Sequence, residues 1–418
     1  MATLRNEELP SWICCQLGAR EHYAVPRALH QTGQLAHLIT DGWVPPQSAL
    51  NQLPISLFTN LRERFHGDLT QASVHAFTGS LMRFELTQRL QKTSGWERII
   101  DRNHWFQKQA VQVLNAIDPQ RSSLNSPPTL FAYSYAALEL FRYAKTRGWR
   151  TILGQIDPGP TEEKLVLEEH ARHRTYPSSW QPAPPHYWVN WQEECSLADR
   201  IVVNSLWSSQ ALEQAGIAAN KLDIIPLAYE PPKQAHDFVR TYPAAFSAER
   251  PLRVLFLGQV ILRKGMAALL EAAQTLRNQP IEFWVVGSQG IARPSQTQQQ
   301  ERVRWMGSVP RSATVKYYQQ ADVFLFPTLS DGFGLTQLEA QAWKLPVIAS
   351  RFCGAVVKDR VSGLILQEVT GKAIANALQF CLQNPRQLEA FARESTKASF
   401  FSLSQLQQYL QALPYDVV

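Results

Sequence analysis

The chain has 418 residues, which is long enough for two domains that each bury a hydrophobic core. Hydrophobic residues make up 45% of it and charged residues 18%, a composition that fits a globular protein and excludes a disordered chain. The net charge of +6 suits an anionic ligand or a membrane surface, but without an arginine-rich run it does not indicate nucleic-acid binding.

The five cysteines, at positions 14, 15, 195, 353 and 381, are scattered, and none has metal-ligand spacing. We therefore expect buried, reduced thiols. Arg5, Glu7 and Glu8 precede the first apolar run, which is not typical of a signal peptide. No stretch approaches the ~18 consecutive apolar residues of a membrane span. These features predict a cytoplasmic protein, and its positive charge leaves peripheral contact with the inner face of the membrane open.

The first half of the chain alternates between short apolar runs and segments with helical periodicity. Apolar runs that end at glycine or in a polar turn are typical of buried parallel strands, so the pattern predicts strand–helix–strand units. The expected strands are 11–17, 35–40, 130–135, 150–156, 200–204 and 222–226, and the expected helices are 23–30, 98–116, 136–146, 161–173, 189–198 and 206–215.

Two loops of this half follow predicted strands, at the edge of a parallel sheet where ligands bind. The loop 18–22 lacks the Gly-x-Gly-x-x-Gly pattern of a nicotinamide or flavin site. His22 in this loop is a candidate site residue, although a lone loop histidine is more often a surface or capping residue. Asp157 follows the strand 150–156 and is a second candidate at the same edge.

Residues 231–251 are polar and interrupted by prolines, which indicates a linker between a domain at 1–230 and another at 252–399. The segment 400–418 contains an amphipathic helix. In the second domain the expected strands are 252–257, 281–287, 303–307, 322–327 and 347–349, and the expected helices are 266–276, 310–320 and one that begins near Leu335.

The turn from Asp331 to Leu335 joins a buried strand to a helix through Gly332-Phe-Gly334. Free backbone N–H groups and the helix dipole favour an anion at such a helix start. Because helical side chains lean toward the amino end, Glu339 can point its carboxylate at the same ligand. Such turns are common in α/β proteins and a lone aspartate there is usually a cap, so the turn alone leaves both interpretations open.

A basic turn, Arg263-Lys264-Gly265, lies between the strand that ends before Gly258 and the next helix. Two cations at a helix start form another anion-binding feature. The alternative for this turn is an ordinary solvated basic loop.

Several short blocks occur in one order along the second half, and together they resemble the donor-binding domain of the group 1 (family 4) glycosyltransferases. The match covers residues 198 to 366, including 198–205 and 225–226, and is only topological before 198. The blocks are Phe-Leu-Gly at 256–258, Arg-Lys-Gly at 263–265, Val-Val-Gly at 285–287, Trp-Met-Gly at 305–307, Tyr-Tyr at 317–318, Ala-Asp at 321–322, Asp-Gly-Phe-Gly-Leu at 331–335, Glu-Ala at 339–340 and Pro-Val-Ile at 346–348.

This resemblance implies the GT-B fold, an α/β architecture of two facing Rossmann-like doubly wound domains with a cleft between them. Residues 1–230 would then bind the acceptor, 252–399 the donor, and the helix in 400–418 would cross back onto the first domain. The family consists of retaining, metal-independent enzymes without a cofactor. Their members move a sugar from a nucleotide-diphosphate sugar to a hydroxyl group, here of a glycan or lipid-linked acceptor.

The family signature is a pair of glutamates with seven residues between them, and here these positions hold Asp331 and Glu339. The resemblance assigns Glu339 to the ribose, Asp331 to the donor sugar and Lys264 to the leaving diphosphate, where a fixed cation stabilises developing charge. His22 and Asp157 are the candidates on the acceptor side. Further donor contacts are implied for Gly18, Gly258, Gln259, Arg263, Gly332, Phe333, Gly334 and Leu335.

The sequence departs from the family pattern at two donor positions. Gln259 stands where the family usually has arginine, and Asp331 is one methylene shorter than glutamate. These departures keep a second hypothesis open, a catalytically weakened or inactive relative that binds a nucleotide sugar or glycan. A third possibility, another GT-B enzyme such as an epimerase or phosphorylase, is disfavoured by the block order around 331–339.

Overall fold

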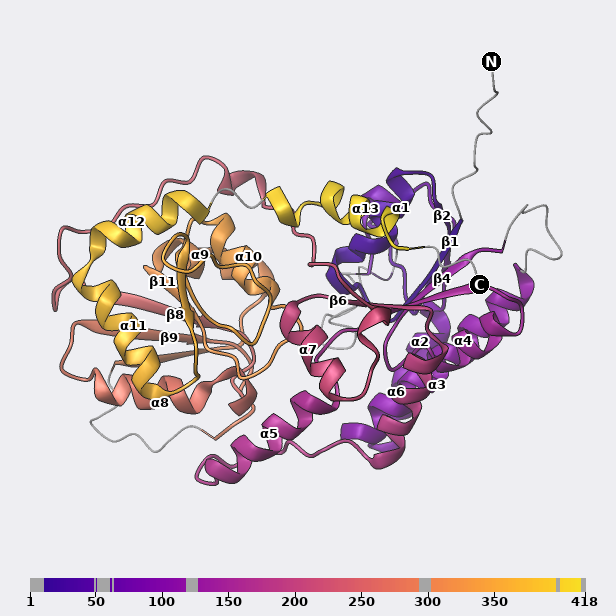
Figure 1. The fold of residues 1–418 in the computed structure, drawn as a ribbon, viewed down its shortest axis with the longest axis horizontal. Helices are drawn as coiled ribbons and strands as arrows, with labels where there is room; N and C mark the ends of the chain where they lie inside the picture. Colours follow the sequence, from indigo (N-terminus) through magenta and orange to yellow (C-terminus); the bar gives the residue numbers. More distant parts are fainter. Residues whose placement is uncertain are drawn as a thin grey trace, which may run out of the picture.

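The computed structural model describes residues 11–48, 50, 61, 64–117, 127–292, 302–395 and 399–414. Figure 1 shows two lobes, each with a sheet covered by helices, and α7 lies at their junction. The first lobe contains β1 Trp12–Gln16, α1 Ala24–Gln31, β2 Leu35–Thr40, β3 Val74–Ala76, α2 Thr78–Gln91, α3 Gly95–Ala116, β4 Thr129–Tyr133, α4 Leu138–Lys145, β5 Arg150–Gly154, α5 Pro160–Arg172, α6 Pro185–Leu197, β6 Arg200–Val203, α7 Leu206–Gln214 and β7 Leu222–Ile224.

The last helix of the described chain returns to the first lobe. The second lobe repeats the alternation of strands and helices. Its elements are β8 Leu252–Leu257, α8 Met266–Thr275, β9 Ile281–Val286, β10 Val303–Gly307, α9 Thr314–Gln320, β11 Val323–Phe326, α10 Leu335–Ala342, β12 Val347–Ser350, β13 Gly363–Leu366, α11 Gly371–Gln383, α12 Pro385–Glu394 and α13 Leu403–Gln411.

Both sheets are wound in the same order and are parallel throughout the described strands. The first has the order β3-β2-β1-β4-β5-β6-β7 and the second β10-β9-β8-β11-β12-β13. The winding direction reverses between β1 and β4 in the first sheet, and between β8 and β11 in the second. Ligands of doubly wound folds bind beyond the carboxyl ends of the strands at such reversals. The basic turn and the Asp331–Leu335 turn follow β8 and β11, so both lie at the reversal of the second sheet.

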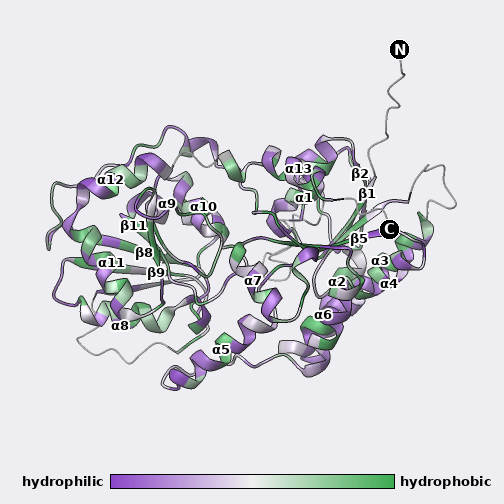
Figure 2. Cartoon of the chain, viewed as in Figure 1, coloured by the Kyte–Doolittle hydropathy of each residue, from purple (hydrophilic) through white to green (hydrophobic). Residues whose placement is uncertain are grey.

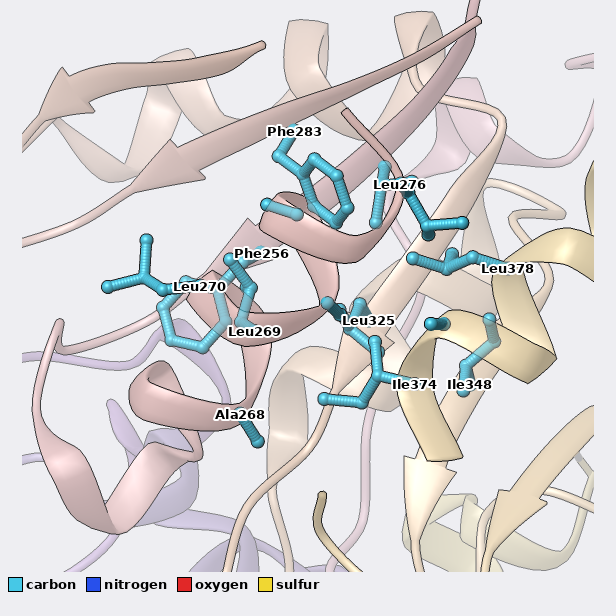
Figure 3. Packing of buried hydrophobic residues seen from close by; sticks show 14 of the residues in the cluster. Phe256, Ala268, Leu269, Leu270, Leu276, Phe283, Leu325, Ile348, Ile374 and Leu378 are labelled. Atoms are coloured by element: carbon cyan, nitrogen blue, oxygen red, sulfur yellow. The ribbon is translucent and has the colours of Figure 1, made fainter. Parts of the chain in front are cut away.

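The core of the second lobe forms where helices pack onto the buried strands. Leu269 of α8 and Ile374 of α11 meet the sheet beside Phe256, Phe283 and Leu325, as Figure 3 shows, and all five are at most 3% exposed. In Figure 2 the strands β8 and β9 are coloured as hydrophobic, whereas α5 on the outside is mostly hydrophilic. Burial of one such large apolar side chain stabilises the fold by about 1.5–3 kcal/mol.

The segment 231–251, predicted to be a linker, lies against the second lobe. The guanidinium of Arg240 is buried and donates to the carbonyl oxygens of Tyr318 at 2.6 Å and Trp343 at 2.9 Å. The Tyr242 hydroxyl donates to the Asp322 carbonyl oxygen at 3.0 Å, and Arg250 pairs with the Asp322 carboxylate at 2.6 Å. The described part of this segment is therefore fastened to the lobe that follows it.

Helix α13 leaves the second lobe and packs on α1 of the first, as Figure 1 shows. Its buried side chains Leu403, Leu406 and Leu410 join the cluster that contains Trp12 and Tyr23. The apolar side expected for the helix in 400–418 is the face that α13 buries; residues 415–418 lie outside the described residues.

Most predicted strands are found within two residues of their expected ends, and the differences have local causes. Helix α6 begins at Pro185 rather than at 189, because proline is favourable in the first turn of a helix, where its missing N–H has no partner to lose. The expected helix 310–320 starts with a 3-10 turn at Arg311–Ala313. Among the described helices, none combines the length and apolar character that crossing a lipid bilayer requires.

We predict that Leu410→Ala lowers the free energy of unfolding by about 2–5 kcal/mol, because the side chain is 1% exposed and its loss leaves a cavity between α13 and α1. Urea unfolding followed by circular dichroism measures this. Gln408→Ala on the exposed side of the same helix is the matched control. Equal stability of the two variants would show that α13 is not held by this contact.

Candidate functional site

The two lobes touch where the Asp331–Leu335 turn meets the first sheet. A Cβ atom on Gly332 would lie 2.5 Å from the carbonyl oxygen of Ile156, so a side chain does not fit at this point. The Ser208 hydroxyl donates to the Gly332 carbonyl oxygen at 3.3 Å, and the Trp207 indole N–H donates to Ser330 Oγ at 3.1 Å. The main chain of the second lobe is thus fitted directly against the first lobe.

Two neighbouring cavities lie between the lobes at this junction. The first, of about 370 Å³, contains Lys264 in its wall and is called the Lys264 cavity. The second, of about 350 Å³, contains Glu339 and is called the Glu339 cavity. Glu21 of the first lobe lines both, so the two cavities adjoin there. Each lies within the size range of small-ligand sites.

In the Lys264 cavity, the ammonium group of Lys264 pairs with the Asp331 carboxylate and lies 5.3 Å from the centre of the Phe326 ring. The two side chains come from the turns after β8 and β11, neighbouring strands at the sheet's reversal. Burial raises the pKa of Asp331, but the charges of Lys264 and then Arg263 more than offset this, so the pKa lies below its usual value. Asp331 is therefore an anion that Lys264 already neutralises.

Arg263 lines the same cavity and contacts the first lobe. Its Nη1 donates to the Ser330 carbonyl oxygen at 2.8 Å and lies 3.3 Å from Oε2 of Glu162 on α5. Burial raises the pKa of Glu162 to about 7 against the opposing charge of Arg263. The Arg263 carbonyl oxygen accepts from the Leu329 N–H at 2.8 Å, so the basic turn and the Asp331–Leu335 turn are held side by side.

The Asp331–Leu335 turn presents the start of α10 to the Lys264 cavity. Gly334 adopts φ +89° just before the helix, a conformation that favours glycine, and a Cβ there would lie 2.5 Å from the Phe326 ring. The side chain of Phe333 is buried against Leu338 and the Phe401 ring, so the turn offers main chain rather than this ring to the cavity. The Gln337 N–H donates to the Gly334 carbonyl oxygen at 3.1 Å, whereas the N–H groups of Leu335 and Thr336 precede the first bonded turn and can bind an anion.

Glu339 lies in the neighbouring cavity rather than beside Asp331. Its Oε2 accepts from the Tyr318 hydroxyl at 2.7 Å, and its Oε1 lies 3.3 Å from the Arg311 guanidinium. Tyr229 lines the same cavity. A ligand that meets both carboxylates must therefore extend across the junction of the two cavities. The expectation that both point at one ligand holds only for an elongated molecule.

The first lobe closes both cavities with the loop that follows β1. Glu21, His22 and Tyr23 are three consecutive non-glycine residues with left-handed φ values of 50°, 53° and 58°. Each costs roughly 1–2 kcal/mol relative to an ordinary conformation. The buried Tyr23 side chain anchors the loop's end, so the loop is held in a strained position facing the second lobe.

The other predicted first-lobe residues have different positions. His22 lines the Glu339 cavity, where enclosure by the walls and then the charge of Arg311 lower its pKa to about 4. Gly18 and Asp157 are described residues that line neither cavity. The Gly18 N–H donates to the Asp41 carboxylate at 3.0 Å. The Asp157 carboxylate accepts from the Tyr135 hydroxyl and from the Gly159 N–H at 2.9 Å.

On the second-lobe side, Gly258 and Gln259 line the Lys264 cavity with Arg263, Gly334 and Leu335. The side chain of Gln259 is exposed there.

The cavity walls also contain residues to which the sequence analysis gave no role in the site. Arg20 and Asn204 line the Lys264 cavity, and Arg311 and Tyr318 line the Glu339 cavity. The position of Arg20 in a loop after a strand was an available signal. The five cysteines are buried and unpaired. In the part of the chain that the structure describes, no group of three His, Cys, Asp or Glu side chains is arranged to hold a metal ion.

Comparison with known proteins assigns the second lobe to a family. The model of a family described as glycosyl transferases group 1 matches residues 251–384, which include both turns, Lys264, Asp331 and Glu339. Residues 251–384 of this chain are therefore similar to the group 1 glycosyltransferases. The resemblance of the second-half sequence blocks is thereby confirmed.

Curated relatives match this chain over only part of their own length. The D-inositol 3-phosphate glycosyltransferase of Corynebacterium urealyticum is 34% identical over 153 residues, which are 33% of this chain and 36% of the relative. The amylovoran biosynthesis glycosyltransferase AmsK of Erwinia amylovora is 25% identical over 193 residues, 43% of this chain and 46% of the relative. The matches thus span between a third and a half of these relatives.

Solved structures match almost the whole length of this chain. Anabaena HepE in complex with UDP-glucose has a TM-score of 0.59 at 14% identity and covers 96% of this chain and 98% of its own. The sucrose-phosphate synthase of Thermosynechococcus elongatus has a TM-score of 0.64 at 16% identity, with 96% and 97% covered. At such identities the likeness shows the fold, and the predicted GT-B architecture of two Rossmann-like domains is confirmed.

We predict that Gly332→Ala forces the lobes apart, because the new methyl group would meet the Ile156 carbonyl oxygen. Small-angle X-ray scattering should detect a larger radius of gyration, with secondary structure unchanged by circular dichroism. Gly79→Ala in α2 is the control, since nothing lies within 4 Å of a Cβ at that position. An unchanged radius in Gly332→Ala would mean that the lobes are not in this contact in solution.

Proposed function

We propose that this protein is a retaining glycosyltransferase that moves a sugar from a nucleotide-diphosphate sugar to a hydroxyl group of a glycan or lipid-linked acceptor. The observation that carries the proposal is the pairing of Lys264 with Asp331 beside the start of α10, at the reversal of the second sheet. A cation and the N–H groups at the start of α10 line one cavity there, which supports binding of a diphosphate.

In this proposal the donor extends across both cavities. Its diphosphate lies in the Lys264 cavity against the N–H groups that begin α10, and its sugar lies near Asp331. Its ribose reaches the Glu339 carboxylate, whose orientation is fixed by Tyr318. The separation of the two carboxylates into adjoining cavities supports this arrangement, since an elongated donor has its ribose and its sugar on opposite sides of the diphosphate.

The transfer step follows from this placement. The bond between the anomeric carbon and the diphosphate oxygen breaks, and a bond forms from the same carbon to the acceptor oxygen on the same face of the sugar. The acceptor proton passes to the departing diphosphate, so atoms and charge balance. Lys264 exchanges Asp331 for the developing phosphate charge, which it stabilises because its position is fixed before the reaction. This fixed cation is proposed to serve where other glycosyltransferases use a metal.

The first lobe would bind the acceptor. His22 is proposed as an acceptor contact, because it lines a cavity between the lobes. Asp157 is retained as a positioning residue, since its carboxylate is occupied by Tyr135 and Gly159. Gly18 shapes the loop after β1. The five buried thiols are compatible with a cytoplasmic location, where the acceptor would be met in solution or at the membrane face.

The alternative of a weakened or inactive relative rests on a specific observation. Gln259 is uncharged and exposed in the Lys264 cavity, and Asp331 is held by Lys264 rather than directed freely at a ligand. The presence of Lys264 in the same cavity and the carboxylate of Glu339 in the adjoining one favour activity. Mass spectrometry of reactions with a panel of nucleotide sugars distinguishes the two, because an active enzyme releases the nucleoside diphosphate and an inactive relative does not.

We predict that Lys264→Gln weakens binding of the best ligand among UDP, GDP and ADP by about 10–100-fold, since it removes a charge-assisted contact of about 1.5–3 kcal/mol. Binding of the corresponding nucleoside should not change. In Asp331→Asn, Lys264 loses its competing partner, so the same diphosphate should bind as tightly as in wild type or more tightly. Isothermal titration calorimetry measures the binding of diphosphate and nucleoside to the wild-type protein and to both variants. Undiminished diphosphate binding by Lys264→Gln would remove the donor-site assignment.

Glu339→Ala should weaken the nucleoside diphosphate and its nucleoside alike, by about tenfold or more, because both present the ribose to the lost carboxylate. The matching test uses the 2′-deoxynucleoside diphosphate. Wild type should bind it less tightly than the ribonucleotide, and Glu339→Ala should bind the two equally. A variant that still discriminates between them would place the ribose elsewhere.

A further inference from the structure

Arg20 is a first-lobe cation in the wall of the Lys264 cavity. It begins the 3-10 turn Arg20–Tyr23 after β1, its side chain is exposed, and its guanidinium carbon lies 5.6 Å from the centre of the Tyr133 ring. Lys264 and Asp331 line the same cavity from the second lobe. Arg20 therefore approaches the candidate diphosphate position from the lobe that does not contain the family's donor motifs.

The charges of the cavity single Arg20 out. Lys264 is neutralised by Asp331, and Arg263 lies 3.3 Å from Glu162. Among the described cations that line this cavity, Arg20 is the one without a carboxylate within ion-pair distance. The position after Gly258 is the uncharged Gln259. Because Lys264 and Arg263 already face carboxylates, they leave little positive charge for a diphosphate, which carries two negative charges in a nucleotide sugar.

The loop fixes the backbone from which the Arg20 side chain extends into the cavity wall. The three residues after it have left-handed backbones, and the last of them, Tyr23, is fully buried. Glu21 lies at the junction of the cavities, where burial raises its pKa to about 7 against the charge of Arg20, so near neutral pH it carries only part of a negative charge. A guanidinium in this position can bind phosphate oxygens through two parallel N–H groups.

We propose that Arg20 binds the diphosphate of the donor from the first lobe, so that the donor is clamped between Arg20 and Lys264. This rests on the proposed function and adds a donor-binding residue to it. Arg20 supplies the positive charge that Gln259 does not. It also makes diphosphate binding depend on the contact between the lobes, because the two cations come from different lobes.

The test compares a nucleoside diphosphate with its nucleoside, using the best ligand among UDP, GDP and ADP. Isothermal titration calorimetry on Arg20→Ala should show about 10–100-fold weaker diphosphate binding with the nucleoside unaffected. Arg20→Lys should lie between wild type and Arg20→Ala. Arg83→Ala, on the exposed side of α2, is the matched control and should bind as wild type does.

A charge-relocation variant separates electrostatics from a structural effect. Arg20→Ala combined with Gln259→Arg moves the guanidinium to the other wall of the same cavity and should recover most of the lost diphosphate affinity. Equal unfolding midpoints of the variants establish that each is folded.

Two results would overturn the inference. If Arg20→Ala binds the diphosphate as wild type does, or loses diphosphate and nucleoside affinity equally, Arg20 is not a phosphate ligand. If wild type binds none of the three nucleoside diphosphates, the proposed function fails first and this inference with it.

Discussion

The structure depends on a contact in which no side chain fits between the two lobes. The main chain at Gly332 lies against the Ile156 carbonyl oxygen, and Ser208 and Trp207 hydrogen-bond to the same turn. Because each sheet has its winding reversal at this edge, the contact brings the two ligand-binding edges of the fold together. The cavities on either side of the turn are a consequence of that fit.

The electrostatics of the junction follow from the same arrangement. Cations in the turn after β8 and in the loop after β1 line the Lys264 cavity. Carboxylates in the turn after β11 and on α5 pair with two of these cations. An anionic ligand can replace the Asp331 carboxylate as the partner of Lys264, and Asp331 then keeps the nearby positive charge of Arg263. This avoids much of the cost of an unpaired buried charge, which is large in a site sheltered from water. Arg263, tied to Glu162, instead serves to join the lobes.

Local patterns predict much of this fold and part of its site. Apolar runs that end at Gly258 and Pro327 give β8 and β11, and the glycines and cations after them place Lys264 and Asp331 at one sheet edge, where they form an ion pair. The short strand β3 has too few residues for a periodicity signal. No strand or helix was predicted in the region that forms β13, α11 and α12, and these elements are seen only in the structure.

What the sequence could not predict depends on how the lobes pack. The pattern at 331–339 places both carboxylates on one helix start, but the placement of Glu339 in a separate cavity depends on Tyr318, Arg311 and the opposing loop of the first lobe. Arg20 belongs to the half that resembles the family only in topology. The loop in which it lies continues through three consecutive left-handed residues, a run that the types Glu and Tyr do not signal.

A crystal structure of the protein with the nucleoside diphosphate that it binds best tests the central claim most directly. The account predicts the diphosphate in the Lys264 cavity, within hydrogen-bonding distance of Lys264 and of the N–H groups that begin α10, with the ribose against Glu339. Phosphates bound instead beside Arg311 in the Glu339 cavity, or a nucleotide outside the junction of the lobes, would contradict it.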